Sequence, residues 1–288
     1  MNAALTALGL SHHPFDPDVP LRALTRTPAT EFFCRRVGSL AKRGGFALLT
    51  GAPGTGKSVA LRLLRDSLLR AGPEHTVTVL ERPHASVADF YREIGHLYGV
   101  PLTPHNRWAG ASRLRKAWRD FAQEACLQAV LIIDEAQEMF DAVLAELRLL
   151  AGEQLDAGWL LTVVLCGDDR LPERLATATL APLANRIRVR VHLEEQAVET
   201  LEEVLMHQVE TAGNPAAFAP EVIRTLAEQA GGNLRSLMHL ADQALSLAID
   251  REATVVDQEV LLAAAESAQQ QRHPGARTGQ RQAVGRRP

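Results

Sequence analysis

Cysteine is scarce in this chain, with three residues of this type among 288. Cys34, Cys126 and Cys166 are far apart in the sequence, and each lies in an apolar context. An odd number of widely spaced thiols matches neither a disulfide framework nor the ligand spacing of a zinc site. We therefore expect free, reduced thiols that pack in the interior.

Long apolar runs and a basic N-terminal region are also missing. No segment approaches the ~20 consecutive apolar residues that a membrane-spanning helix needs. The opening residues MNAALTALGLSHHPF contain no lysine or arginine, and Gly9 interrupts their apolar stretch, so a signal peptide is not expected. These absences predict a cytoplasmic protein without a membrane partner.

Acidic residues are missing from the last part of the chain. Arg272 to Pro288 hold five arginines and no aspartate or glutamate. The whole chain carries a net charge of −3, so the part before this segment carries about −8, which is −3 minus 5. Because residues 270–288 also lack apolar periodicity, we expect a basic disordered tail. Such a tail can bind DNA or an acidic partner, and a solubilising role is the alternative.

Apolar residues make up 46% of the chain, which is enough for a sizeable core. Up to about residue 193, short β-rich runs alternate with segments of helical periodicity, a pattern typical of a mostly parallel α/β sheet. Beyond that point only helical periodicity remains, which predicts a small all-helical second domain. The expected strands are Phe46–Thr50, Thr76–Leu80, Ala129–Ile133, Leu160–Leu165 and Ile187–Leu193.

Helices are expected between these strands and after them. Ser86 and Asp89 have the spacing of a capping box, which predicts a helix start at Ser86. The other helices are expected over residues 31–42, 57–71, 112–125, 139–154, 180–185, 195–211, 220–229, 234–251 and 257–269. The chain then divides into an N-terminal segment (1–30), an α/β core (31–193), a helical domain (194–269) and the tail (270–288).

The stretch GAPGTGKS, from Gly51 to Ser58, fits the P-loop pattern and lies between an expected strand and an expected helix. Its glycines allow backbone N–H groups to surround phosphate oxygens, and the helix amino end adds a favourable dipole. Lys57 would reach the β and γ phosphates, and the Ser58 hydroxyl would bind Mg²⁺; a plain glycine-rich turn is the alternative. The expected nucleotide-binding residues are Gly51, Ala52, Pro53, Gly54, Thr55, Gly56, Lys57 and Ser58.

Two carboxylates, Asp134 and Glu135, follow the apolar strand in AVLIIDEAQ. Ligands gather at the carboxyl ends of parallel strands, so both side chains are placed for chemistry on a phosphate. Asp134 would hold Mg²⁺, and Glu135 would orient or deprotonate the attacking water. An ordinary solvated strand end is the alternative.

At three further positions the sequence indicates a role at the γ phosphate less strongly. Asp168, or its neighbour Asp169, follows the next strand and could respond to the γ phosphate. Arg186 and Arg235 could each neutralise transition-state charge on that phosphate, although each one alone is also typical of a surface arginine.

Taken in order, GAPGTGKS, LIIDEAQ, LCGDDRL, LANRIRVRVHL and AGGNLRSLMHLADQAL resemble the AAA+ ATPases of the ExeA-like group. The resemblance extends from about His13 to about residue 265. The group includes secretion-associated ATPases and the transposition helper ATPases of the TnsC, TniB and MuB kind. It implies a P-loop AAA+ fold, in which a parallel five-stranded sheet carries helices on both faces and a small all-helical lid follows.

The resemblance also implies ATP hydrolysis with Mg²⁺, and it places residues 1–30 near the nucleotide. The implied roles are Walker A for Gly51–Ser58, Walker B for Asp134 and Glu135, sensor 1 for Asp168, a finger acting in trans for Arg186, and sensor 2 for Arg235. A finger in trans implies self-association into a ring or filament, and Arg174 is a rival for that role. Relatives often carry glutamine where this chain has Asp168, whose charge would repel the γ phosphate unless it is protonated or paired.

Within this group, secretion relatives carry a membrane segment and a cell-wall module that are not found here, which favours the transposition branch. The expected function is then an ATP-dependent DNA-binding regulator of transposition, which assembles on double-stranded DNA and recruits or activates a transposase. The alternatives are an ExeA-like ATPase that serves secretion or envelope assembly, and a nucleotide-gated signalling scaffold.

DNA contacts would use phosphate groups rather than base edges. In the segment HNRWAGASRLRKAWRDFAQEAC, helical spacing places Leu114, Trp118 and Phe121 toward the core. Arg107, Arg113 and Lys116 would face outward and could contact DNA, although a plain solvated face is the simpler interpretation. Trp108 and Trp118 are both expected to pack in the interior rather than stack on bases.

Overall fold

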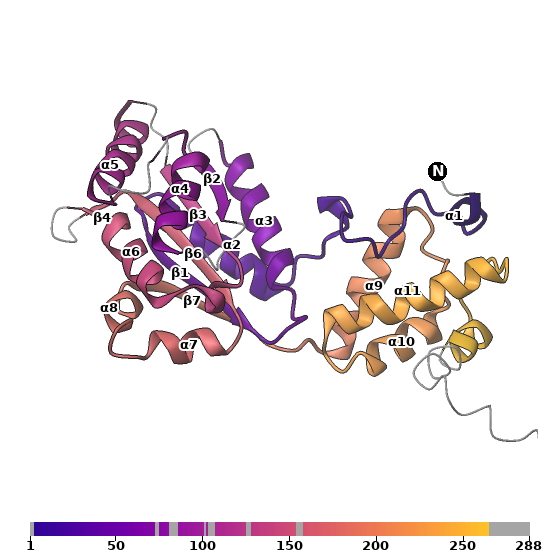
Figure 1. Ribbon diagram of the computed structural model, residues 1–288. Helices are drawn as coiled ribbons and strands as arrows, with labels where there is room; N and C mark the ends of the chain where they lie inside the picture. Colours follow the sequence, from indigo (N-terminus) through magenta and orange to yellow (C-terminus); the bar gives the residue numbers. More distant parts are fainter. Residues whose placement is uncertain are drawn as a thin grey trace, which may run out of the picture. The chain divides into compact units, whose positions relative to one another are not determined.

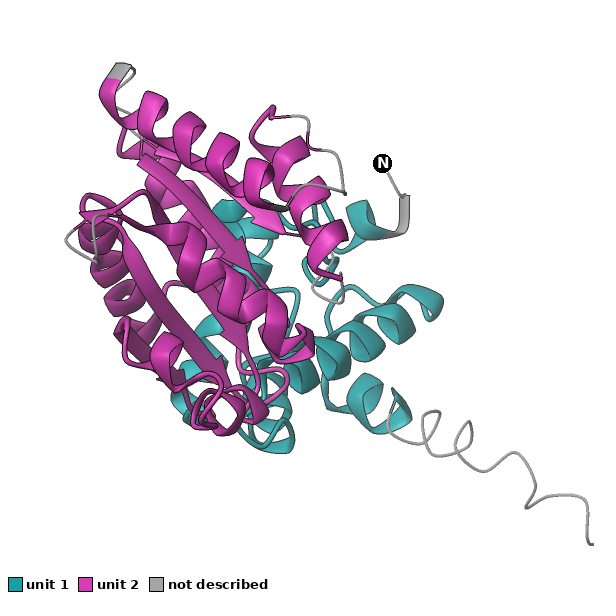
Figure 2. Ribbon diagram, turned by 60° about the vertical axis from the view of Figure 1, so that its left-hand side comes forward, with its two compact units in different colours: residues 1–25, 197–288 teal, residues 26–196 magenta. Residues whose placement is uncertain are grey.

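The structure is a computed structural model that describes residues 3–72, 75–80, 86–100, 102, 107–124, 128–153 and 158–264. The chain forms two compact units, which Figure 2 shows in different colours. Residues 26–196 form the α/β unit, and residues 1–25 together with 197–288 form the helical unit.

A five-stranded parallel sheet forms the centre of the α/β unit, with the strand order β2-β3-β6-β1-β7 (Figure 1). Every residue of β1 and β6 is buried, which explains why their sequences are continuously apolar rather than alternating. This order places the carboxyl ends of β1, β3 and β6 side by side. The strands are β1 (Gly45–Gly51), β2 (His75–Leu80), β3 (Gln128–Ile133), β6 (Leu161–Gly167) and β7 (Ile187–Leu193).

Helices cover both faces of this sheet (Figure 1). One face carries α2 (Pro28–Ala41) and α3 (Lys57–Arg70), and the other carries α4 (Val87–Leu97), α5 (Arg107–Glu124) and α6 (Asp141–Ala151). The side chains of Phe46, Phe90 and Trp118 are fully buried in the core between them. The predicted P-loop fold, a parallel five-stranded sheet between layers of helices, is confirmed.

Helix α4 starts where the sequence predicts it. Ser86 Oγ accepts a hydrogen bond from the Asp89 backbone N–H at 3.2 Å, and the same hydroxyl donates to Asp89 Oδ2 at 2.7 Å. An N-cap of this kind typically contributes about 1 kcal/mol to helix stability.

The helical unit contains α9 (Val198–Ala212), α10 (Pro220–Gln229) and α11 (Leu234–Asp250), followed by helical residues 258–264. Their apolar faces meet in one core that includes Leu205, Leu226 and Leu237. Leu5 and Leu8, in and after the short helix α1 (Ala3–Ala7), pack in the same core. The expected helix over 257–269 is therefore seen in its first part, whereas the expected tail at 270–288 lies outside the described residues.

Several short elements were not expected from the sequence. They are η1 (Leu21–Ala23), η2 (Ala136–Glu138), α7 (Arg170–Leu175) and the two-stranded hairpin of β4 (Gly152–Glu153) and β5 (Gly158–Trp159). The short helix α8 (Ala181–Ala184) lies within an expected helix. Helix α5 begins five residues before the expected start, at Arg107 instead of Ser112. Apart from α5, these elements are too short for their periodicity to be read from sequence.

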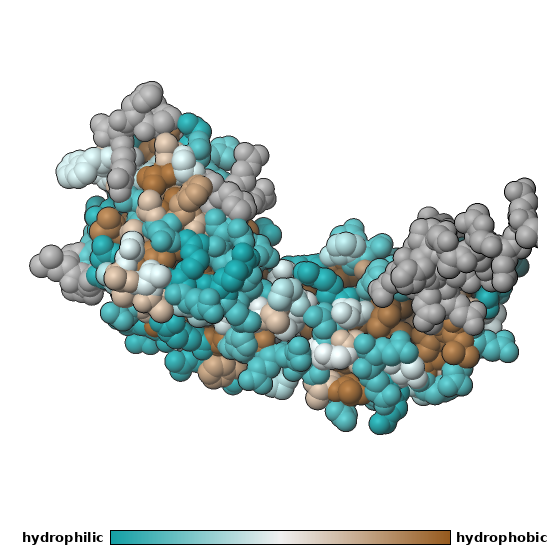
Figure 3. All heavy atoms as spheres, turned by 60° about the horizontal axis from the view of Figure 1, so that its bottom comes forward, coloured by the Kyte–Doolittle hydropathy of each residue, from teal (hydrophilic) through white to brown (hydrophobic). Residues whose placement is uncertain are grey.

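The surface in Figure 3 is mainly hydrophilic and is interrupted by smaller groups of apolar residues. None of the helices in the described part of the chain combines the length and hydropathy that a bilayer crossing requires. Cys34 and Cys166 are free and buried, as expected, and Cys126 lies outside the described residues. Burial raises the pKa of the Cys34 thiol to about 11 and also raises the pKa of Cys166, so both remain protonated at neutral pH.

Candidate nucleotide-binding site

The P-loop connects the end of β1 at Gly51 to the start of α3 at Lys57. Gly54 and Gly56 have φ angles of 87° and 97°, which a residue with a side chain rarely adopts. A loop of this shape turns its backbone N–H groups toward a common centre at the amino end of α3. The predicted nucleotide-binding segment therefore has the backbone of an anion cradle.

Lys57 is held inside this loop. Its side chain is 8% exposed, and Nζ donates to the carbonyl oxygens of Gly51 at 2.8 Å and Ala52 at 3.0 Å. Thr55 Oγ1 donates to the same Ala52 oxygen at 2.8 Å, which stabilises the turn. The ammonium group is thus fixed at the loop, where it can bind phosphate oxygens.

The structure leaves no room for a side chain at Gly51, the first residue of the P-loop. A Cβ atom at Gly51 would lie 2.5 Å from the Leu193 carbonyl oxygen and 2.7 Å from Thr55 Oγ1. A side chain at this position would therefore push β7 and the loop apart. Gly51 therefore allows the end of β1 to approach β7 closely at the start of the loop.

The predicted Walker A and Walker B residues are brought together by the strand order. Ser58 Oγ on α3 donates a hydrogen bond to Asp134 Oδ2, which follows β3, at 3.2 Å. The other carboxylate oxygen of Asp134 accepts from the Glu135 backbone N–H at 2.9 Å. A hydroxyl beside a carboxylate is a donor set that Mg²⁺ prefers, so these residues fit the predicted metal ion.

Glu135 has an unusual backbone, with a φ of 51° in the left-handed region. Conformations of this kind cost about 1–3 kcal/mol and are frequent at functional sites. The strain lies at the residue that the sequence identifies as the catalytic carboxylate.

Gln137, the last residue of the DEAQ segment, is a part of the site that sequence reasoning missed. Its side chain is 5% exposed and bridges two predicted site residues. Nε2 donates to Glu135 Oε2, and Oε1 accepts from the backbone N–H of Asp168 at 3.2 Å. The letter Q directly after DEA was the only sequence indication, and it does not reveal which groups the amide contacts.

Asp168 is paired with a cation. Arg170 Nε donates to Asp168 Oδ2 at 2.9 Å, and the Arg170 backbone N–H donates to Oδ1 at 3.0 Å. These hydrogen bonds lower the pKa of the Asp168 carboxyl below its usual value. The charge that sequence analysis identified as unfavourable near a γ phosphate is therefore balanced by Arg170. The sensor 1 role of Asp168 stays a prediction.

The three candidate arginines differ in their surroundings. Arg186 is half-buried just before β7, and its Nη1 donates to the Pro182 carbonyl oxygen at 2.8 Å. Arg235 is exposed in the first turn of α11, in the helical unit. Arg174 binds the backbone oxygens of Gln137 and Met139 and the carboxylate of Asp141. Both Arg174 and Arg186 thus have backbone partners within the chain, and the finger role stays a prediction.

Helix α5 confirms one of the two tryptophan predictions and corrects the other. Leu114 and Trp118 are buried and Arg113 and Lys116 are exposed, as expected, whereas the Arg107 side chain is outside the described part. Trp108 is 85% exposed, so its predicted packing in the interior is wrong. It lies in the first turn of α5.

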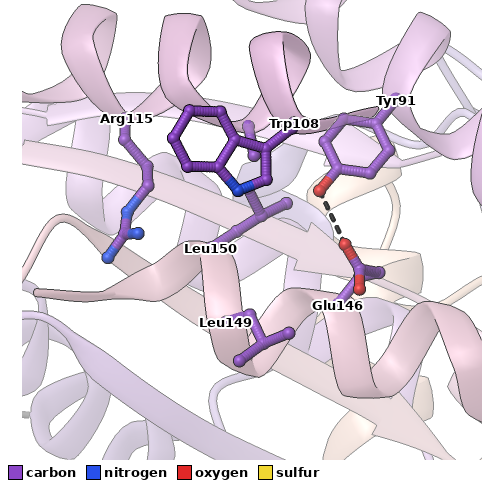
Figure 4. A pocket seen from close by; sticks show the side chains of 7 residues that line it. Tyr91, Trp108, Arg115, Glu146, Leu149 and Leu150 are labelled. Atoms are coloured by element: carbon purple, nitrogen blue, oxygen red, sulfur yellow. Dashed lines mark hydrogen bonds between the residues drawn. The ribbon is translucent and has the colours of Figure 1, made fainter. Parts of the chain in front are cut away.

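Trp108 borders a cavity of about 360 Å³ that is separate from the P-loop (Figure 4). On its floor, Tyr91 OH donates to Glu146 Oε2 at 2.7 Å. The remaining lining residues are Ala111, Arg115, Leu149 and Leu150. None of them belongs to the Walker motifs.

Comparison with known proteins supports the class that the fold and the P-loop indicate. Residues 40–175 match the family described as "AAA domain". Over 228 residues the chain is 32% identical to "General secretion pathway protein A" of Aeromonas hydrophila, a match that covers 77% of this chain and 41% of the relative. The chain thus spans about two fifths of the length of that relative.

Solved structures show the same fold. The ORC2 protein of Aeropyrum pernix, in its ADPNP–ADP complexes, has a TM-score of 0.69 at 15% identity over 88% of this chain and 71% of its own. The ORC1 protein of the same organism, in complex with DNA, has a TM-score of 0.64 at 20% identity over 90% of this chain and 69% of its own. The AAA-domain match and the 32% identity support an ExeA-like AAA+ ATPase, and the solved structures share its fold.

Proposed function

We propose that this protein hydrolyses ATP to ADP and phosphate at the site between the P-loop and Asp134. The observation that carries the proposal is the 3.2 Å contact between Ser58 Oγ and Asp134 Oδ2, because it joins the two Walker motifs. The similarity of residues 40–175 to the AAA domain supports the same reaction.

Each residue of the site has a defined task in this reaction. The loop from Gly51 to Ser58 and the Lys57 ammonium bind the phosphates, while Ser58 and Asp134 would hold Mg²⁺, which would neutralise phosphate charge. Glu135 orients a water molecule and accepts its proton as the water oxygen bonds to the γ phosphorus. The bond from that phosphorus to the bridging oxygen breaks, and ADP leaves with the oxygen.

Replacement of Glu135 by Gln tests the reaction. We expect Glu135→Gln to bind ATP normally and to lose turnover by at least about 100-fold, because the amide cannot accept the proton. The exposed Glu173→Gln on α7 is the matched control and should keep wild-type turnover. Phosphate release and binding of a fluorescent ATP analogue are measured for both variants. Full turnover by Glu135→Gln would refute the assigned role.

We further propose that the ATPase serves secretion or envelope assembly, with a membrane or cell-wall component as its partner. The 32% identity to "General secretion pathway protein A" supports this process. Binding of ATP would stabilise one arrangement of self-associated subunits, and hydrolysis would release it. Turnover should then respond to an envelope component, such as a membrane fraction or purified peptidoglycan, and not to DNA.

One structural observation favours a second candidate, the DNA-binding regulator with a transposase as partner. Trp108 is exposed on the same helix as the exposed cations Arg113 and Lys116. Exposed cations of this kind can bind the phosphate groups of duplex DNA. A solved relative of the same fold, ORC1 of Aeropyrum pernix, is described as a complex with DNA.

Turnover and sedimentation, with and without duplex DNA, distinguish the two candidates at low and physiological salt. Salt-dependent assemblies that need both ATP and DNA would support the DNA candidate, and Lys116→Ala should then weaken them and reduce their salt dependence. Unchanged turnover and sedimentation with DNA would leave the secretion proposal as the better account. The exposed Lys42→Ala is the matched control.

A further inference from the structure

We propose that Gln137 is a positioning residue, which holds the Glu135 carboxylate in its catalytic orientation and couples it to the segment that follows β6. The inference rests on the proposed ATPase function, because Glu135 acts as a base only if the chain hydrolyses ATP. It assigns a task to the fourth residue of DEAQ.

The amide of Gln137 is suited to this bridge by its chemistry. The Glu135 carboxylate can only accept a hydrogen bond, and the Asp168 backbone N–H can only donate one. The amide donates through Nε2 to Glu135 and accepts through Oε1 from Asp168, so its orientation is determined by both partners. A glutamate at position 137 would lose the hydrogen-bond donor. A methionine, with a side chain of similar length, would lose both the donor and the acceptor.

Gly167 leaves space for this amide because it has no side chain. A Cβ atom at Gly167 would lie 2.4 Å from Gln137 Oε1 and 3.0 Å from Leu171 Cδ2. Because Gln137 is 5% exposed, water cannot easily replace its hydrogen bonds. The packing at Gly167 therefore keeps the amide between Glu135 and Asp168.

Further contacts join Gln137 and the two residues after it to Arg170 and Arg174. Arg170 Nη2 donates to Glu138 Oε1 at 2.6 Å while it also binds Asp168. Arg174 binds the backbone oxygens of Gln137 and Met139. The short helix η2 therefore cannot move independently of residues 168–174. A displacement of Asp168 would be transmitted through the amide to Glu135.

Enzyme kinetics of Gln137→Met test the inference. We expect kcat to fall about 10- to 100-fold with unchanged binding of a fluorescent ATP analogue, since a catalytic group that loses its orientation costs about that much. In the background of Glu135→Gln the same change should cause no further loss, because Gln137 acts through Glu135. Gln208→Met, at a buried glutamine of the helical unit, is the matched control.

A second variant, Gln137→Glu, keeps the shape and the acceptor for Asp168. The carboxylate cannot donate to Glu135, so we expect kcat to fall as in Gln137→Met while binding of the ATP analogue is unchanged. A merely structural glutamine would accept this isosteric change with wild-type kcat. The inference is overturned if both variants keep wild-type kcat, or if the double variant loses further activity.

The outcomes separate this inference from the function on which it rests. Absence of turnover in the wild-type protein, or full turnover in Glu135→Gln, refutes the ATPase proposal and this inference with it. Loss of turnover in Glu135→Gln, together with wild-type kcat in both Gln137 variants, refutes only the role of Gln137.

Discussion

At the scale of single residues, Lys57 shows how the P-loop holds a buried ammonium group where a ligand can reach it. Its ammonium lies among backbone carbonyls of its own loop, with hydrogen bonds of 2.8 and 3.0 Å. Hydrogen bonds to a charged group are stronger than neutral ones, so such a group loses little when it is desolvated within the loop. Phosphate oxygens can then be bound without an additional desolvation cost at the lysine.

Loss of this ammonium should strongly weaken nucleotide binding. For Lys57→Ala we expect at least a ~10- to 100-fold weaker affinity for a fluorescent ATP analogue, because charge-assisted hydrogen bonds contribute about 1.5–3 kcal/mol each. The exposed Lys42→Ala should bind normally. Wild-type affinity of Lys57→Ala would show that the loop binds phosphate without this side chain.

Asp168 allows a prediction about pH. Arg170 lowers the folded-state pKa of this carboxyl, so the pair stabilises the fold above about pH 4 and loses that contribution as the pH falls through the folded-state pKa. In Arg170→Met we expect the pKa of Asp168 to rise toward its ordinary value. A carbon-13 NMR titration of the carboxyl group measures it, and an unchanged pKa would contradict the pairing.

At the scale of elements, α5 combines a buried and an exposed tryptophan. Trp118 is 1% exposed and meets the ring of Tyr98 edge-to-face at 5.3 Å, whereas Trp108, ten residues earlier, is 85% exposed. Trp118 lies in the core beside Tyr98, whereas Trp108 lies at the rim of the cavity that Tyr91 also lines. Helical spacing placed Trp118 correctly, but it could not show which side chains of the first turn are covered.

The two tryptophans should therefore differ in their effect on stability. We expect Trp118→Ala to lower the free energy of unfolding by about 3–5 kcal/mol, because it empties a large volume of the core. The change in Trp108→Ala should stay within about 0.5 kcal/mol. Thermal and urea unfolding, followed by circular dichroism, compares them. Equal effects would contradict the burial described for α5.

At the scale of the whole molecule, the finger role of Arg186 requires more than one subunit. Arg186→Ala should bind ATP as a monomer but turn it over slowly, and Glu135→Gln should bind ATP without hydrolysis. If Arg186 acts in trans, a mixture of these two variants regains turnover, because one interface combines an intact Glu135 with an intact Arg186. Phosphate release from the mixture, compared with each variant alone, measures the effect. A mixture that stays as inactive as its components would place the finger elsewhere.

Local information in the sequence was sufficient for much of the fold. The five strands follow from short β-rich apolar runs, the all-helical second unit from the helical period of about 3.6 residues, and the start of α4 at Ser86 from capping chemistry. The P-loop and the Asp134–Glu135 pair follow from spacing, because consecutive residues must form the phosphate cradle. All of these features depend on neighbours along the chain.

Only the tertiary structure decided which residues that are distant in the sequence meet, because these contacts depend on strand order and packing. Gln137 meets Asp168, 31 residues away, because β3 and β6 are adjacent and Gly167 leaves space for the amide. The same adjacency pairs Arg174 with the backbone after β3. A sequence determines which groups are available by their type and local spacing. The partner that each side chain finds depends on the distance between elements, which only the folded chain establishes.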